Sequence, residues 1–237
     1  MAQAAKSNLG YVISFIIMVI ALASMLILRG EHYLLFSFAC LIACMLPFYW
    51  RFENRKLRAR EIVFIAVLAT IAAVVRVPFA PLPSVQPTSF VIIVSALALG
   101  KDSGFIIGAT AAIVSNIFLG QGPWTPWQMF CWGMMGVTAG IIGHYKWAHN
   151  IYWLCALGGI YGFLFGWIMD LWYVLAYVSP LNVKTILAAY VASFYFDLAH
   201  ALSNVFFLFF FYRSWFGIIS RFKVKFGLLA DETGKNT

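Results

Sequence analysis

Six polar side chains that can hydrogen-bond or carry charge interrupt the long apolar stretches of this sequence: Asn116, Gln128, Asp170, Asp197, His200 and Asn204. Such a group inside a membrane span is unfavourable by several kcal/mol unless it has a partner, so each is a candidate for ligand binding. The last three are spaced by three and four residues and share one helix face. These residue types predict reversible binding of a polar ligand.

The stretch Ser115–Gln128 concentrates such groups in a turn. Its two glycines free the backbone and its two prolines remove donors, so neither neighbouring helix continues through it. The pattern predicts a helix that ends near Leu119, then Thr125 as the N-cap of a new helix with Pro126 at its first position. An ordinary interfacial turn anchored by tryptophans is the alternative.

The composition requires a membrane protein. Of 237 residues, 63% are hydrophobic and only 10% are charged. This apolar fraction is larger than any soluble domain needs to form its core. The net charge of +8 follows from lysines and arginines in loops, and calls for no nucleic-acid partner. The fold class is therefore all-α, a polytopic helical bundle.

Eight apolar segments are long enough or apolar enough to lie in the membrane. They are Leu9–Leu28, Tyr33–Trp50, Ile62–Val77, Thr88–Gly100, Gly104–Gly120, Trp127–Gly143, Ile151–Val178 and Ile186–Tyr212, followed by a basic tail from Arg213 to Thr237.

Lysine and arginine predict the orientation. With the N-terminus inside, thirteen of these residues lie on the inner side and only Arg29, Arg76 and Lys184 lie outside. Both termini are then cytoplasmic, and the Ser115–Gln128 turn faces outward.

The basic block Arg51–Arg60 divides the chain. Residues 1–59 hold two accessory helices and a basic loop, 60–213 form a six-helix membrane core, and 214–237 form the basic tail. The core differs from the first part because it is rich in glycine, proline and aromatic residues.

We expect an outward-facing pocket in this core, because polar and aromatic residues of several segments fall in the same half of the bilayer. The candidate substrate-binding residues are Asn116, Trp124, Thr125, Trp127, Gln128, Asp170, Tyr173, Asp197 and His200. Two alternatives remain open: Asp197 and His200 only satisfy each other or a neighbouring helix, and the aromatic residues only form an interfacial belt.

The loop Pro78–Pro87 precedes the unusually short segment Thr88–Gly100. Its prolines exclude a helix, and irregular backbone at membrane depth is typical of cavity walls. We expect this loop to act as a lid, with Pro81, Pro83 and Ser84 as its gating residues.

Small residues recur at four-residue spacing on several segments. In lipid, such faces allow helix backbones to approach closely, so most of them should serve packing within the chain. The pair Ala69 and Ala73 could instead dock another membrane protein.

Several kinds of chemistry have no support in the sequence. No histidine pair has the spacing of a zinc protease, and no phosphate loop is present. Cys40, Cys44, Cys131 and Cys155 lie inside apolar runs and predict neither disulfides nor a metal site. We expect no metal, no cofactor and no enzymatic activity.

Three motifs resemble the substrate-binding S component of an energy-coupling factor (ECF) vitamin transporter. Ala69-Thr70-Ile71-Ala72-Ala73 is similar to the family's AxxxA docking motif, and the run Leu99–Gly108 to its glycine-rich hairpin. The stretch Ser115–Gln128 resembles the signature of a subgroup that includes cobalamin carriers. The resemblance covers roughly residues 60–213, and the two N-terminal helices depart from it.

The resemblance implies a multi-pass subunit of a bacterial plasma membrane. Its partners would be a transmembrane T component and two cytoplasmic ATPases. Its transported substrate would be cobalamin or a related corrinoid, captured outside and released inside after the subunit topples in the membrane.

Three other hypotheses stay open. The substrate could be a different vitamin or a nucleoside-like precursor. A membrane-embedded enzyme would use Asp170, Asp197 and His200 as a catalytic set, and would turn over without ATPase partners. A structural or assembly subunit would bind no small molecule.

Overall fold

The computed structural model of the chain describes residues 33–54 and 57–228. The expected first segment, Leu9–Leu28, and the last nine residues lie outside this range. Within it the chain is helical and contains no strand: α2 (Tyr33–Glu53), α3 (Ala59–Val74), α4 (Pro87–Leu99), α5 (Lys101–Leu119), α6 (Thr125–Ile142), the 3₁₀ helix η1 (Lys146–His149), α7 (Ile151–Tyr177) and α8 (Val183–Lys225). The all-α class is thus confirmed for the described residues.

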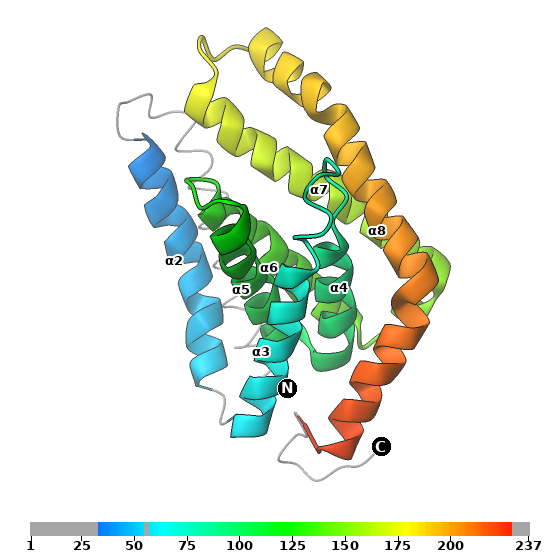
Figure 1. The fold of residues 1–237 in the computed structure, drawn as a ribbon. Helices are drawn as coiled ribbons and strands as arrows, with labels where there is room; N and C mark the ends of the chain where they lie inside the picture. The colour runs from blue at the N-terminus through cyan, green and yellow to red at the C-terminus, as the bar shows by residue number, and fades with distance from the viewer. Residues whose placement is uncertain (1–32, 55–56, 229–237) are drawn as a thin grey trace.

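The helices alternate in direction, which gives the bundle two ends (Figure 1). The basic end carries Arg58, Arg60, Lys101, Arg221 and Lys225. We call the other the distal end, and it holds the connections 75–86, 120–124 and 178–182.

Glycine sets two of the helix ends. Gly100 alone separates α4 from α5 and has a φ of 88°, and Gly120 ends α5 with a φ of 106°. Residues with a side chain rarely adopt a positive φ of this size, so only glycine makes these sharp breaks without strain. The predicted helix end near Leu119 is confirmed.

The short helix α4 lies at the centre of the bundle and contacts α3, α5, α6 and α8. All thirteen of its residues are buried. At about 1.5 Å per residue it is roughly 20 Å long, shorter than a ~30 Å hydrocarbon core. Burial on every side explains why its sequence is apolar without a polar face.

Glycines allow α5 and α6 to pack closely. A Cβ on Gly136 would overlap the backbone of Gly104, and a Cβ on Gly108 would overlap the carbonyl of Trp132. The helices α7 and α8 approach in the same way, where a Cβ on Gly162 would overlap Ala201. The expectation that most glycine stripes serve internal packing is confirmed for these pairs.

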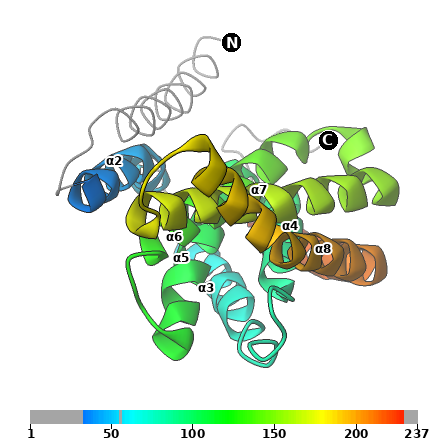
Figure 2. The same cartoon turned by 90° about the horizontal axis from the view of Figure 1, so that it is seen from above.

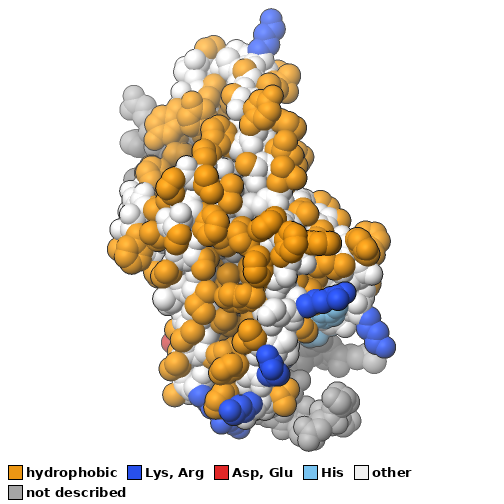
Figure 3. All heavy atoms as spheres, turned by 45° about the vertical axis from the view of Figure 1, so that its right-hand side comes forward, with side chains coloured by type: hydrophobic (Ala, Val, Ile, Leu, Met, Phe, Trp, Pro, Cys, Tyr) orange, Lys and Arg blue, Asp and Glu red, His pale blue; other side chains and the backbone are white. Residues whose placement is uncertain are grey.

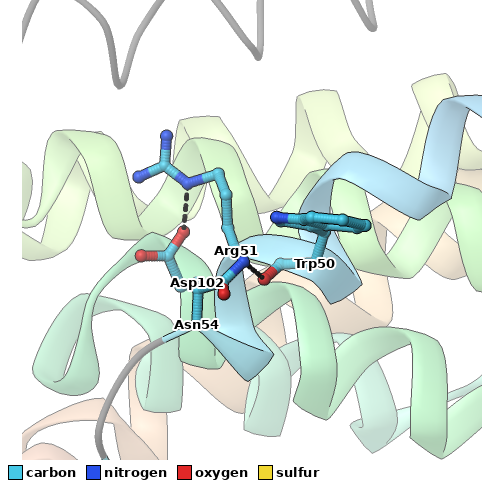
Figure 4. Close-up of polar contacts among 4 residues, drawn as sticks. All are labelled: Trp50, Arg51, Asn54 and Asp102. Atoms are coloured by element: carbon cyan, nitrogen blue, oxygen red, sulfur yellow. Dashed lines mark hydrogen bonds and ion pairs between the residues drawn. The ribbon is translucent and has the colours of Figure 1, made fainter.

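Seen from above, α2 lies on one side of the bundle and α8 on the other (Figure 2). The helix α2 contacts α5 and α6, and Phe48 stacks on Phe105 with 4.4 Å between ring centroids. At the basic end, Arg51 forms an ion pair with Asp102 at 3.5 Å, while Asn54 donates to the carbonyl of Trp50 (Figure 4). This N-terminal helix is therefore attached to the core at several points.

The last helix is longer than predicted. It continues for 43 residues to Lys225, whereas the sequence predicted a span that ended at Tyr212 and a tail from Arg213. Residues after Tyr212 still contribute to the core, since Ile219 is buried, and the first helix-breaking residue is Gly227 with a φ of 54°. The basic residues had suggested a tail, but the apolar face among them continues the helix.

Three described helices, α5, α7 and α8, are long and apolar enough to cross a membrane, and α4 is a shorter apolar helix. Hydrophobic side chains cover the middle of the face in Figure 3, and most of its lysines and arginines lie in the lower part. This distribution fits a protein surrounded by lipid.

The glycine contact between α5 and α6 gives a test of the fold. We expect Gly136→Ala to lower the stability by about 1–3 kcal/mol, because the added methyl group forces α5 and α6 apart. Gly217→Ala on α8 is the matched control, since a Cβ there meets nothing within 4 Å and alanine favours a helix. Thermal unfolding in detergent measures the stability of both variants. A melting temperature of Gly136→Ala equal to that of the wild type would contradict the close contact.

Candidate functional site

Three of the predicted residues meet at the distal end. The amide nitrogen Nδ2 of Asn116 donates to Gln128 Oε1 at 2.7 Å and to Thr125 Oγ1 at 3.0 Å. Asn116 and Gln128 are buried, with 1% and 6% of their surfaces exposed. The side-chain oxygen Oδ1 of Asn116 accepts from Arg76 Nη1 at 2.7 Å. We call Arg76, Ser115, Asn116, Thr125 and Gln128 the distal network.

Arg76 is a central member that the sequence analysis had counted only as an outer loop charge. Its Nη1 also donates to Ser115 Oγ at 3.0 Å, and its guanidinium lies 5.2 Å from the ring centroid of Trp132. The signal was present: a lone arginine follows an apolar helix, two residues after its end and just before the proline-rich loop. An arginine at such a position either extends its guanidinium to the interface or bonds to buried partners, as Arg76 does.

Ring contacts connect this network to α7 and α8. Trp132 stacks on Phe165 with centroids 5.2 Å apart, and Phe165 meets the edge of His200 at 4.9 Å. The buried His200 shares a hydrogen bond with Ser89 Oγ at 2.8 Å. Five helices therefore contribute side chains to one continuous polar and aromatic region at the distal end.

The two carboxylates form a separate contact between α7 and α8. Ser193 Oγ donates to Asp170, and it lies 3.4 Å from Asp197 Oδ2. Asp197 is buried and sits directly against Gly166. Asp197 and His200 do not bond to each other: His200 bonds to Ser89 of the neighbouring helix α4, which is the second form of that alternative, and Asp197 lies against Ser193 of its own helix.

The aromatic residues of the predicted pocket differ in placement. Trp124 meets the edge of Trp172 at a centroid distance of 6.0 Å and covers Gly122. Trp127 is 1% exposed and lies in the apolar core with Phe105 and Phe130, so it supports the turn from within. Tyr173 is 49% exposed and contacts Tyr177.

The N-cap prediction is wrong by one residue. Trp124 occupies the cap position of α6, and Thr125 is its first helical residue. The Thr125 hydroxyl instead donates to Gln121 Oε1 at 2.9 Å and accepts from Asn116. Trp124 is the cap residue in place of Thr125, because the Thr125 hydroxyl joins the turn to α5.

The loop between α3 and α4 contains turns and no helix, as predicted. Gln86 donates its backbone N–H to Ser203 Oγ at 3.0 Å, and Phe79 packs on Phe207. Between these anchors, Pro81 and Pro83 are exposed, and Ser84 has a φ of 58°. The loop is thus fixed near both ends and exposed at its tip, the region assigned to gating.

The predicted docking alanines face the wrong way for that role. Ala69 and Ala73 are buried, with 2% and 0% exposed, on the side of α3 that packs into the bundle. Ala66 and Thr70, one turn apart on the same helix, are exposed. The four-residue spacing was visible in the sequence, but it occurs on both faces of α3, and periodicity could not choose between them.

A groove of about 560 Å³ runs between α3 and α8 toward the basic end. Its walls are almost wholly apolar and include Val63, Val67, Ile218 and Phe222, with Arg60 also contributing. It lies away from the distal network, which is at the opposite end of the bundle.

No group of three or more histidine, cysteine, aspartate or glutamate residues within 33–54 and 57–228 could hold a metal ion. Several buried polar atoms in the described part of the chain have no partner there, among them Trp132 Nε1, Trp172 Nε1, Gln86 Oε1 and Thr88 Oγ1. Unpaired buried donors and acceptors are uncommon in folded proteins, and here they add to the groups that a ligand could satisfy.

A model of the family described as "ECF transporter, substrate-specific component" matches residues 60–222. The comparisons with curated proteins and with solved structures found no match.

Proposed function

Because the chain belongs to the ECF transporter substrate-specific components, we propose that it captures a vitamin at the distal end and delivers it across the membrane. The observation that carries this proposal is the distal network, where the buried polar groups of α5 and α6 meet Arg76 below an exposed loop. Subunits of this family bind and transport substrates, which fits a protein without enzymatic activity.

The preferred substrate is cobalamin or a related corrinoid. The corrin ring is wide and flat and carries amide side chains, so it needs aromatic faces and many hydrogen-bonding partners. The pair Trp124 and Trp172 offers the first, and Gln128 and Arg76, which Asn116 holds in place, offer the second. The stretch Ser115–Gln128 also resembles the cobalamin-type subgroup. A different vitamin or a nucleoside-like precursor is the second candidate, since fewer of these groups would suffice for it.

The proposed orientation follows the positive-inside rule. With its positive charges Arg58, Arg60, Arg221 and Lys225, the basic end would lie in the cytoplasm of a bacterial cell, and both termini would be on that side. The distal end then faces the medium from which a vitamin is taken up.

The proposed partners are a transmembrane T component and two cytoplasmic ATPases. The exposed face of α3, with Ala66 and Thr70, allows another helix to approach closely. The apolar groove between α3 and α8 continues this face toward the basic end. The subunit would topple against the T component to release its substrate inside.

Binding of vitamins to the purified protein tests the proposed function. In isothermal titration against a vitamin panel, we expect cobalamin to bind to the wild type. Gln128→Ala should lower the affinity roughly tenfold to a hundredfold, since a lost partner for a buried hydrogen bond costs about 1–3 kcal/mol. Asp170→Ala, which removes the carboxylate that accepts from Ser193, should lower it similarly. Gly217→Ala, far from this end, should bind normally. Failure of the wild type to bind any vitamin would refute the proposal.

The two faces of α3 give a test of partner docking. We expect Ala66→Leu with Thr70→Leu to abolish assembly with the T component while vitamin binding survives, because large side chains block close approach. Ala69→Leu with Ala73→Leu should instead lower the melting temperature, because both sites are buried. Co-purification and thermal unfolding separate the two effects. Normal assembly of the first variant would exclude this face.

The proposed lid can be tested by labelling. Leu82, 53% exposed between Pro81 and Pro83, is replaced by cysteine and treated with a membrane-impermeant maleimide. Cobalamin should slow the labelling, because closure of the loop over the ligand covers its tip. Val183→Cys, at the distal start of α8 and 81% exposed, is the control that should label equally with and without ligand. Unchanged labelling of Leu82→Cys at saturating ligand would rule out gating.

A further inference from the structure

The guanidinium of Arg76 is held among neutral partners. Its Nη1 donates to Ser115 Oγ at 3.0 Å and to Asn116 Oδ1 at 2.7 Å, and one face lies over Trp132. The residue is only partly exposed. A buried charge is unfavourable unless an opposite charge or a full set of hydrogen bonds compensates it.

No carboxylate of the described residues forms an ion pair with Arg76. The two acids on the distal half of α7 and α8, Asp170 and Asp197, lie against Ser193. The neighbouring His200 is already bonded to Ser89. Within residues 33–54 and 57–228, the positive charge of Arg76 therefore has no anionic counterpart.

The unused donors of Arg76 have a defined arrangement. Both contacts made by the guanidinium use Nη1, so Nε and Nη2 have no acceptor among the described residues. These two nitrogens form the side of the planar fork that binds two oxygens of a carboxylate or phosphate at once. Ser115, Asn116 and Trp132 fix the plane of the fork in advance, which favours such bidentate binding.

We propose that Arg76 binds an anionic group of the substrate, a phosphate or a carboxylate, through Nε and Nη2. This inference rests on the proposed function and specifies the chemistry of its ligand. A corrinoid substrate would supply the phosphodiester of its nucleotide loop. The amide groups of Asn116 and Gln128, which lie next to the guanidinium in the distal network, would then face neutral parts of the same molecule.

A purely structural role for Arg76 predicts a different result. In that case the guanidinium only holds Ser115 and Asn116 at the end of α5, and its loss would disturb the whole site. All ligands would then be weakened alike, whatever their charge.

Cobalamin and cobinamide separate the two roles, because cobinamide is a corrinoid without the nucleotide loop and its phosphodiester. Titration of both into wild type and Arg76→Gln should show a loss of roughly tenfold to a hundredfold for cobalamin and little change for cobinamide. Arg76→Lys, which keeps the charge but not the fork, should lie between. Equal losses for both ligands, or no loss for cobalamin, would overturn the inference. Size-exclusion profiles and melting temperatures establish that each variant is folded.

The vitamin panel distinguishes failure of this inference from failure of the proposed function. If the wild type prefers a vitamin other than a corrinoid, the inference requires that vitamin to carry a carboxylate or phosphate and to lose affinity in Arg76→Gln. Preference for a neutral or cationic vitamin would overturn the inference and leave the proposed function standing. Binding of no vitamin would refute both.

Discussion

The close contact between α5 and α6 fixes the geometry on which the candidate site depends. On α5 the contact passes through Gly104 and Gly108, and on α6 through Gly136 and the backbone of Trp132. The same four-residue steps lead to Asn116 on α5 and Gln128 on α6. At this point a hydrogen bond of 2.7 Å from Asn116 Nδ2 to Gln128 Oε1 joins the two helices. Because glycine brings the backbones together, the two buried amide side chains at the distal end can reach each other and form a hydrogen bond.

The pair α7 and α8 repeats this arrangement. Glycines at positions 158, 162 and 166 follow one face of α7, and the next four-residue step is Asp170, which accepts from Ser193 of α8. In both hairpins the small residues lie toward the basic end and the polar residues toward the distal end. This asymmetry gives one end of an otherwise apolar bundle the capacity to bind a polar molecule, and leaves the other end for contacts with lipid or protein.

The sequence predicted the helical class, the glycine contacts within the chain and the meeting of Asn116, Thr125 and Gln128, because apolar length, small-residue spacing and helix-breaking residues act locally. It did not predict the role of Arg76, whose partners Ser115 and Asn116 lie about forty residues away. It assigned Ala69 and Ala73 to partner docking because they match the AxxxA motif, but α3 carries small residues on two faces, and only the packing of α4 and α5 shows which face is buried. Similarly, the basic residues beyond Tyr212 concealed an apolar face that continues α8.

An experimental structure of the subunit with its bound vitamin tests the central claim most directly. We expect the ligand at the distal end, beneath the loop 75–86 and in contact with Arg76, Asn116 or Gln128, with Trp124 against one of its faces. A ligand bound elsewhere, such as in the apolar groove between α3 and α8 near Arg60, with the distal network unchanged from its ligand-free hydrogen bonding, would contradict the account.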